Sequence, residues 1–314
     1  MLEPGTCRAV IINNIAQIGS PPMMKSRRNY SGLSLLCASL VMPATVTFAQ
    51  QFELVYEAHS GQAFAQPHDI TLSSDHRYLY VADNNNDRIA VLDPGSLALL
   101  GSFAEGEVSG PHDVVFQSGG RLLVADTGNS RIAIYEVSGE KGQLVGEYTG
   151  DFYRPEGVAV HPNGRIYVTG AGSNNIVAIE NGKALAKAGG LSSPHDVAVA
   201  ADGSVWIADA GNDRLVRMSE DLKTLTVLEG KPYHFDGPRY LDFDSKGRLY
   251  VADKYAHKIK VLTPDNQLLY TLGEDRSGLG PGVFDRPEGV VISKDQVWFS
   301  DTYNNRIVRY RIRE

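Results

Sequence analysis

Residues 111–116 read PHDVVF, and the phrase LVADTGNSRIAIY follows at 123–135. Relatives of the first phrase recur as PHDITL at 67–72, PEGVAV at 155–160, PHDVAV at 194–199, PRYLDF at 238–243 and PEGVVI at 287–292. A relative of the second phrase comes about fifteen residues after each proline, as in YVADNNNDRIAVL and WFSDTYNNRIVRY. Two phrases that recur six times in the same order are the signature of a repeat architecture.

Each repeat contains four short apolar or alternating runs, separated by Gly, Asn and Asp. In the first repeat the runs cover 69–72, 78–82, 88–92 and 98–103. They read as strands, with no room for a helix of ten residues. Four strands in a unit of 40 to 50 residues predict a blade of a β-propeller. We therefore predict an all-β fold, a six-bladed β-propeller of four-stranded blades.

The two ends of the repeat region predict how the ring closes. The sixth repeat lacks its outermost strand, because the sequence ends at Glu314. Residues 52–57 (FELVYE) precede the first repeat as 98–103 precede the second. We expect this N-terminal strand to complete the last blade and to cover two sheet edges. Residues 50–314 would then form one propeller domain.

The first 49 residues read as an export signal. Its basic start consists of Lys25, Arg27 and Arg28. An apolar run follows, interrupted by Pro43, and small residues at 47–49 suit cleavage. The run is too short for a stable membrane span. Segment 1–22 has no pattern, so we expect translation to start at Met23 or Met24. The predicted location is periplasmic or secreted.

Composition narrows the function classes. The chain has 314 residues, 42% of them hydrophobic, and a formal net charge of −7. Removing 1–49 takes away four of the 30 basic residues and one of the 37 acidic ones, which brings the net charge to −10. An acidic chain argues against nucleic acid as a partner. Both cysteines, Cys7 and Cys37, precede residue 50, so the propeller can form no disulfide.

Residues that are present in nearly every repeat are first interpreted as structural. One such position holds an aspartate at a strand end, expected to accept hydrogen bonds from the turn that follows. A second position holds a basic residue, expected to tie neighbouring blades together. The aspartates are Asp83, Asp126, Asp209, Asp253 and Asp301, and the basic residues are Arg88, Arg131, Arg214, Lys258 and Arg306.

The residue after each repeat proline differs between repeats and is more informative. These residues are His68, His112, Glu156, His195, Arg239 and Glu288. The first strand of a propeller blade lines the central channel, so we expect the six side chains to form a ring at its mouth. Imidazole nitrogen with one carboxylate suits zinc, or iron where coordination positions stay open. Alternate blades give His112, His195 and Glu288 as ligands, with His68 as a possible fourth. The alternative is that each histidine only hydrogen-bonds the backbone of the next blade.

The next residue offers a second cation site. Asp69, Asp113 and Asp196 follow the three histidines and are expected one layer deeper in the channel. With backbone carbonyls they would hold calcium. The alternative for each is an aspartate that caps a turn.

The two phrases resemble the NHL repeat, over residues 52–314. Within that class, the placement of a His directly after the repeat proline resembles the pattern of the peptidyl-α-hydroxyglycine α-amidating lyase family. The resemblance implies that His112 and His195 are zinc ligands and that Asp113 binds calcium. It also implies a catalytic tyrosine, matched by Tyr255 in ADKYAHKI or Tyr303 in SDTYNNRI.

The resemblance implies a metal-assisted elimination that yields an amide and glyoxylate. Tyr255 or Glu156 would take the proton, and Arg239 would hold the substrate carboxylate. The sequence departs from the family pattern at Glu288, where a third histidine is expected. It also lacks the disulfide that flanks the family's tyrosine.

The residues agree to different degrees with three other functions. A non-enzymatic propeller would bind a protein, peptide or glycan on one ring face, where 152–154 and 233–236 are aromatic and polar. A calcium-dependent lactonase fits less well, because histidine dominates the ring. A nucleic-acid platform needs a basic face. We expect a monomer with a small-molecule or peptide ligand at the channel mouth.

Overall fold

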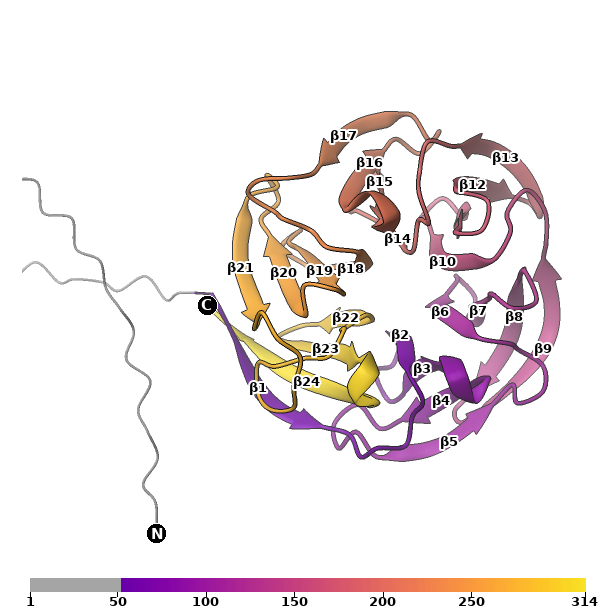
Figure 1. Ribbon diagram of the computed structural model, residues 1–314. Coiled ribbons are helices and arrows are strands. Elements are labelled where there is room, and N and C mark those ends of the chain that lie inside the picture. Colours follow the sequence, from indigo (N-terminus) through magenta and orange to yellow (C-terminus); the bar gives the residue numbers. More distant parts are fainter. Residues whose placement is uncertain (1–51) are drawn as a thin grey trace, which may run out of the picture. The chain divides into compact units, whose positions relative to one another are not determined.

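A computed structural model describes residues 52–314 of the chain. The predicted export signal and both cysteines lie outside the described residues. Six antiparallel four-stranded sheets are arranged around a central axis (Figure 1). The inner strand of each sheet faces the axis, as the position of the repeat prolines predicts. The six-bladed all-β propeller is confirmed.

The first three blades each contain four consecutive strands, ordered from the axis outward. Blade 1 has β2 (Pro67–Leu72), β3 (Leu79–Asp83), β4 (Arg88–Leu92) and β5 (Leu99–Phe103). Blade 2 has β6 (Pro111–Phe116), β7 (Arg121–Asp126), β8 (Arg131–Ser138) and β9 (Lys141–Tyr148). Blade 3 has β10 (Pro155–Val160), β11 (Ile166–Gly170), β12 (Asn175–Glu180) and β13 (Lys183–Ala188).

Blades 4 and 5 follow the same order, and blade 6 closes the ring. Blade 4 has β14 (Val197–Val199), β15 (Val205–Asp209), β16 (Arg214–Met218) and β17 (Thr224–Leu228). Blade 5 has β18 (Pro238–Phe243), β19 (Leu249–Asp253), β20 (Lys258–Leu262) and β21 (Leu268–Gly273). Blade 6 has β22 (Val290–Ser293), β23 (Gln296–Asp301), β24 (Arg306–Arg313) and, outermost, β1 (Glu53–His59).

Blade 6 contains strands from both ends of the propeller. β1 pairs antiparallel with β24, from Glu53 opposite Arg313 to His59 opposite Val308. Glu57 of β1 also accepts from Arg309 and Arg311 on β24, at 2.9 and 2.6 Å. The predicted closure by the N-terminal strand is therefore confirmed.

The core is divided among the interfaces between blades. Six clusters of buried apolar side chains occur in the described residues, and each joins two neighbouring blades. The cluster between blades 1 and 2, for example, contains Tyr80, Ile89, Leu122 and Tyr135. Because strand side chains alternate between faces, a central strand buried on both faces needs the continuous apolar runs seen in the sequence. Burial between blades fixes the ring and therefore the shape of its channel.

The repeated aspartates bind a different loop from the one predicted. Oδ1 of Asp83 accepts from the backbone N–H of Ala65, 2.8 Å away in the loop that precedes the blade. Asp126, Asp209, Asp253 and Asp301 make the same bond. The following turn contributes a side-chain amide where it carries an asparagine, as Asn86 does to Oδ2 of Asp83. The aspartate thus fixes the loop that leads into the inner strand.

The repeated basic residues act within their own blade, which corrects the second structural prediction. Nε of Arg88 donates to Asp83 at 2.7 Å, and its Nη2 donates to the carbonyl of Ala63 in the preceding loop. In blade 5 the partner of Asp253 is the buried Lys260, while Lys258 pairs with Asp275. Both arrangements hold the loop from which the ring residue emerges.

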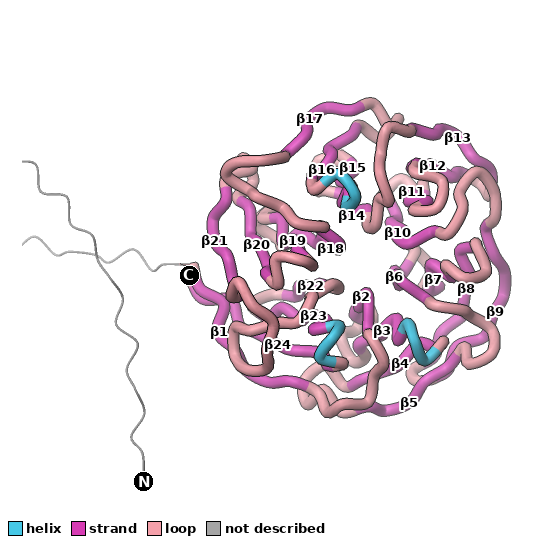
Figure 2. The backbone as a smooth tube through the Cα atoms, viewed as in Figure 1, coloured by secondary structure: helices cyan, strands magenta, loops and turns pink. Residues whose placement is uncertain are grey.

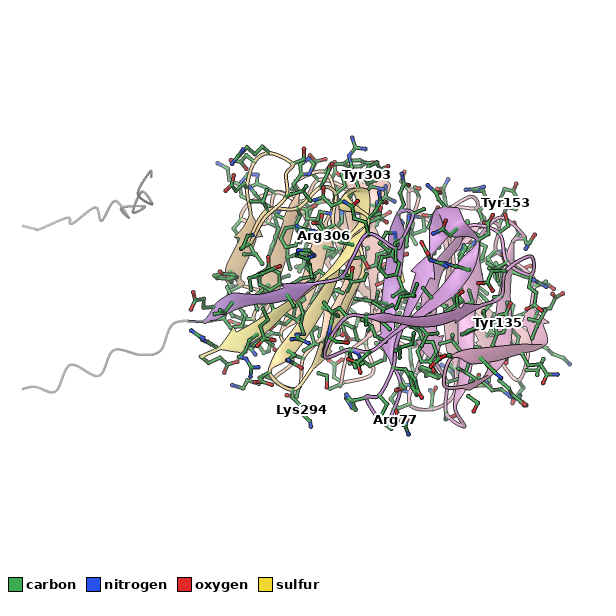
Figure 3. The ribbon with its side chains drawn as sticks, turned by 90° about the horizontal axis from the view of Figure 1, so that it is seen from below. Arg77, Tyr135, Tyr153, Lys294, Tyr303 and Arg306 are labelled. Atoms are coloured by element: carbon green, nitrogen blue, oxygen red, sulfur yellow. The ribbon has the colours of Figure 1, made fainter. Side chains whose placement is uncertain are left out.

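Three short helical turns each join the second and third strands of a blade (Figure 2). They are η1 (Asn84–Asn86), η2 (Ala210–Asn212) and η3 (Thr302–Asn304). Each begins directly after a repeated aspartate. Tyr303, in η3, and Tyr153 lie on one face of the ring, and Lys294 and Arg77 lie on the other (Figure 3). Within residues 52–314 there is no helix of the length and apolarity that a membrane crossing requires.

Candidate metal site at the channel mouth

Three histidines from blades 1, 2 and 4 meet at the mouth of the channel. One ring nitrogen each of His68, His112 and His195 lies within 4.8 Å of the others. The ring centroids of His68 and His112 are 4.4 Å apart, and that of His195 lies 6.1 and 5.7 Å from them. His68, which the sequence argument placed fourth, is thus a full member of the group.

Two buried carboxylates stand beside the imidazoles. Oε2 of Glu288 lies 3.1 Å from Nδ1 of His68 and 3.6 Å from Nε2 of His195. Glu156 lies 3.5 Å from Nε2 of His195 and 3.8 Å from Nε2 of His112. Five of the six ring positions therefore lie close together, and this group includes residues from neighbouring as well as alternate blades.

Burial keeps the imidazoles neutral. Desolvation lowers the pKa of His112 to about 3 and lowers the pKa of His68 and His195 well below its usual range. The positive charges of Lys254 and Arg239 lower the pKa of His68 and His195 further. A neutral imidazole has the lone pair that a metal ligand needs.

The hydrogen bonds of His112 determine which nitrogen faces the channel. Its Nδ1 lies 2.8 Å from the carbonyl of Gly110 and 2.9 Å from Oγ1 of Thr127. The Thr127 hydroxyl proton is directed to the carbonyl of Pro155, so its oxygen accepts from His112. Nδ2 of Asn84 also lies 3.1 Å from Nδ1 of His112. A carbonyl only accepts, and the Gly110 oxygen is the nearest of the three partners, so the contacts favour a proton on Nδ1. The lone pair is left on Nε2, the nitrogen nearer Glu156. This is the arrangement that holds metal-binding histidines in proteins.

Buried nitrogen and oxygen atoms of the ring residues also fit a bound cation. In the described part of the chain, Nδ1 of His195 is buried without a hydrogen-bond partner. Nδ1 of His68 and the two oxygens of Glu288 are also buried, and their only polar neighbours there are each other, at 3.1 Å, Lys254, at 2.6 Å, and His195. Buried polar atoms without partners are costly. Nitrogen and carboxylate ligands that share one dry site fit zinc, or iron where positions stay open.

A second set of residues supports the ring and was missed from the sequence. Each follows the repeated strand-end position and reaches toward the next blade. Asn84, Thr127 and Thr302 donate to the carbonyls of Pro111, Pro155 and Pro67, and Lys254 pairs with Glu288 at 2.6 Å. The sequence could have indicated these residues, because the position varies between repeats as the ring position does. Around the ring it reads Asn, Thr, Ala, Ala, Lys and Thr.

The candidate substrate residues lie on blades 5 and 6. Nη2 of Arg239 lies 3.3 Å from the hydroxyl of Tyr255, and the Arg239 Nε is buried without a partner among the described residues. Tyr255 is 47% exposed and Tyr303 36% exposed. Nζ of Lys254 lies 5.7 and 5.4 Å from their ring centres. Both tyrosines are thus joined to the site through Lys254.

The aspartate layer lies deeper, as predicted, and each aspartate binds a neighbouring blade. The carboxylates of Asp69, Asp113 and Asp196 accept from the backbone N–H of Val114, Val158 and Leu241, at 3.5, 2.6 and 2.8 Å. Burial raises the pKa of all three, that of Asp113 to about 6. Together with Asp242 and apolar residues of the inner strands, they line a cavity of about 190 Å³.

Blade 5 carries Tyr240 where these blades carry an aspartate. Its hydroxyl donates 2.6 Å to the backbone carbonyl of His112 in blade 2, on the opposite side of the channel. Its ring packs edge-on against His195, with centroids 4.8 Å apart. Tyr240 therefore spans the channel at the level of the aspartates.

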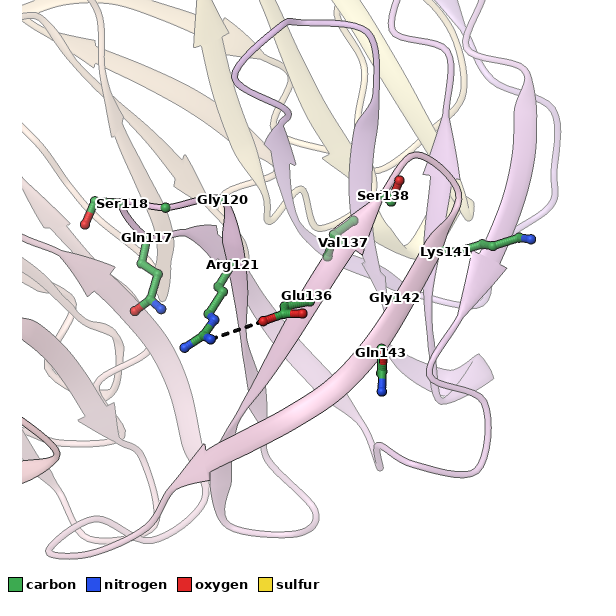
Figure 4. Close-up of a pocket in the computed structure, with 11 residues that line it drawn as sticks. Gln117, Ser118, Gly120, Arg121, Glu136, Val137, Ser138, Lys141, Gly142 and Gln143 are labelled. Atoms are coloured by element: carbon green, nitrogen blue, oxygen red, sulfur yellow. Dashed lines mark hydrogen bonds and ion pairs between the residues drawn. The ribbon is translucent and has the colours of Figure 1, made fainter.

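A larger hollow lies at the outer end of blade 2 and has none of this chemistry (Figure 4). It encloses about 910 Å³, with the Arg121–Glu136 ion pair of 3.1 Å exposed on its wall. No ring residue lines it. Its size does not make it the functional site.

Comparisons with known proteins agree with the fold. An NHL repeat model matches residues 191–218, and a model described as "Lactonase, 7-bladed beta-propeller" matches residues 37–162. The chain has six blades, one fewer than the lactonase description, and one segment of it matches the NHL repeat. No curated protein sequence matches the chain.

Solved structures with similar folds belong to several functional classes. Virginiamycin B lyase from Staphylococcus aureus is 16% identical, with a TM-score of 0.58 and coverage of 83% of this chain and 99% of the other. An auxiliary nutrient binding protein from Bacteroides ovatus is 16% identical, with a TM-score of 0.66 and coverage of 84% and 78%. A putative 6-phosphogluconolactonase from Bacteroides uniformis is 15% identical, with a TM-score of 0.58 and coverage of 80% and 82%. These identities establish the fold alone.

Proposed function

We propose that this protein is an exported, zinc-dependent lyase that cleaves peptidyl-α-hydroxyglycine-like substrates at its channel mouth. The supporting observation is the convergence of three neutral imidazoles and two buried carboxylates beside the Arg239–Tyr255 pair. The location is periplasmic or secreted, and the chain acts as a monomer. Iron is the alternative metal, and the deeper aspartates would hold calcium.

The proposed binding mode follows from charge. Arg239 has an unpartnered buried Nε and an Nη2 near the mouth, so it can hold the substrate carboxylate with paired hydrogen bonds. His68, His112 and His195 would hold the zinc ion, with Glu288 beside them. When bound, zinc polarises the substrate hydroxyl and lowers its pKa.

The proposed reaction is an elimination that balances without a further reagent. The hydroxyl of the α-hydroxyglycine loses its proton, and a carbonyl forms at that carbon. The C–N bond breaks, its electron pair stays on the amide nitrogen, and that nitrogen takes up a proton. The products are a peptide amide and glyoxylate.

Glu156 is the better placed of the two candidate bases. Burial raises the pKa of its carboxyl group to about 7, which suits a group that takes and returns a proton near neutral pH. Its oxygens lie 3.5 to 3.8 Å from two of the metal-site histidines. Tyr255 is the alternative base, and Tyr303 forms the adjacent aromatic wall.

The test is glyoxylate release from an acetylated peptidyl-α-hydroxyglycine in buffer that contains zinc. We expect turnover by the wild type and a loss of at least 100-fold in His195→Ala, because one ligand of the metal is removed. His161→Ala, in the turn between β10 and β11 of blade 3, is the matched control and should keep activity. An inactive, zinc-loaded wild type would overturn the proposal.

Metal analysis separates this proposal from a pure binding function. Tag-free protein should carry about one zinc or iron per chain, as a single catalytic site requires. A propeller that only binds a protein, peptide or glycan on its ring face would carry none, or calcium alone.

A further inference from the structure

Cations and aromatic rings alternate along the mouth from blade 5 to blade 6. The cation–tyrosine ladder, as we name it, consists in spatial order of Arg239, Tyr255, Lys254, Tyr303 and Arg286. Arg239 Cζ lies 5.7 Å from the Tyr255 ring centre, and Lys254 Nζ lies 5.7 Å from Tyr255 and 5.4 Å from Tyr303. Arg286 Cζ lies 4.4 Å from the centre of Tyr303. Four successive contacts of this kind form one continuous strip.

The ladder has more positive charge than its neighbours neutralise. Lys254 pairs with Glu288, but neither Arg239 nor Arg286 has an ion pair among residues 52–314. Asp285, next to Arg286 in sequence, directs its carboxylate to His257 at 3.5 Å. Two guanidinium groups at the two ends of the ladder are therefore available to anions.

The geometry favours recognition of a planar anion. The planar N–H donors of a guanidinium match a carboxylate in pairs. Arg286 lies over the Tyr303 ring, while Arg239 uses Nη2 on the Tyr255 hydroxyl and has an Nε without a partner among the described residues. The partly exposed rings of Tyr255 and Tyr303 offer apolar surface between the two arginines. An extended ligand with two carboxylates and an apolar portion between them fits this arrangement.

The ladder is confined to one sector of the mouth. Blades 2, 3 and 4 carry glycine at the position of Tyr255 and Tyr303, namely Gly128, Gly172 and Gly211. A ligand held at Arg239 therefore meets two tyrosines and a second arginine on the side of blade 6, and the glycine turn of Gly211 on the side of blade 4. Such an asymmetric mouth gives an extended peptide one favoured direction.

We propose that the ladder binds an acidic side chain of a peptide whose terminal carboxylate is held by Arg239, and that Arg286 determines this preference. The inference rests on the proposed function for the placement of the terminal carboxylate. It adds the substrate class: peptides with an acidic residue shortly before the reacting glycine.

Binding of unreactive peptides tests the ladder without turnover. We would titrate the zinc-loaded full chain calorimetrically with acetylated peptides that end in glycine and carry Glu one or two residues before it. Peptides with Gln in place of Glu have the same shape without the charge. At least one Glu peptide should bind about fivefold or more tightly than its Gln counterpart, as one added charge-assisted contact predicts.

Arg286→Gln should bring the Glu-to-Gln ratio close to one and leave the binding of the Gln peptide unchanged. Arg77→Gln is the matched control, because Arg77 also lies over a tyrosine, with its Cζ 5.4 Å from the Tyr78 ring centre, on the opposite face (Figure 3). Equal binding of Glu and Gln peptides to the wild type, or a preference that survives in Arg286→Gln, would overturn the ladder proposal.

The experiments distinguish failure of the lyase proposal from failure of the ladder proposal. Preference for Glu without cleavage of α-hydroxyglycine peptides would overturn the lyase and support the ladder. Cleavage without any Glu preference would support the lyase and overturn the ladder.

Discussion

Nζ of Lys254 lies 2.6 Å from Oε1 of Glu288, and the two side chains come from neighbouring blades. Glu288 is fully buried and Lys254 nearly so. Removal of one member of a buried ion pair leaves an uncompensated charge, which typically costs about 3–5 kcal/mol. The pair also fixes the carboxylate that faces His68 and His195.

Lys254→Met should lower the free energy of unfolding of the metal-free protein by about 3–5 kcal/mol. The double variant Lys254→Met with Glu288→Gln should recover much of that loss, because no buried charge remains. Urea unfolding followed by tryptophan fluorescence measures both. If the double variant is no more stable than Lys254→Met, the cost does not come from an unpaired carboxylate.

Thr127→Val should weaken zinc binding by about 10- to 100-fold, the usual effect of losing the partner of a ligand histidine. The change removes one of the two oxygens beside His112 Nδ1, the other being the Gly110 carbonyl at 2.8 Å, and also the bond to the Pro155 carbonyl. Thr302→Val is the matched control, because the Thr302 hydroxyl donates to a proline carbonyl in the same way without contacting a histidine. Zinc competition titrations compare the two. Equal effects would show that Thr127 acts only on the backbone.

Gly157→Ala should destabilise the fold by about 1–3 kcal/mol and weaken zinc binding. A Cβ at Gly157 would lie 2.5 Å from the carbonyl oxygen of His195, so β10 or the histidine must move. Gly61→Ala is the control, since a Cβ there meets no atom within 4 Å. Urea unfolding and zinc titration measure the two effects. A Gly157→Ala protein with unchanged zinc affinity would show that the displacement does not reach the site.

Glu156 should make the metal-free protein less stable as pH rises through neutrality. Burial raises its pKa from 4.5 to about 7, so the folded state holds a proton that the unfolded state has lost between those values. Its contribution is fully present below pH 4.5 and is lost as pH rises through about 7. The total is at most about 3 kcal/mol.

The comparison with Glu156→Gln isolates this contribution. The free energy of unfolding of the wild type, relative to that of Glu156→Gln, should fall between pH 4.5 and 7 and then stay level. Parallel profiles for the two proteins across this range would contradict the raised pKa.

The repeat phrases were sufficient to predict the six blades, the closure by the N-terminal strand and the ring of residues after the prolines. Periodicity carries this information, because every blade packs against its two neighbours in the same way. The grouping of the three histidines was predicted less completely, since the rule of alternate blades treats the blades as equivalent. The ring of His68 nevertheless lies 4.4 Å from that of His112 in the adjacent blade.

Contacts between different repeats could not be predicted from the repeat pattern. Thr127 and Lys254 act on residues of the following blade, and repeat alignment compares each with its own equivalents instead. Tyr240 reaches across to His112, 128 positions earlier in the chain. Such contacts depend on the curvature that the packed blades impose, which no single repeat encodes.

Tyr240 ties blade 5 to blade 2 across the axis of the ring, through one hydrogen bond to the His112 backbone. The two blades are not neighbours, so this bond couples parts of the ring that no apolar cluster of the described residues joins. A displacement of blade 5 would therefore reach the backbone of a candidate metal ligand directly.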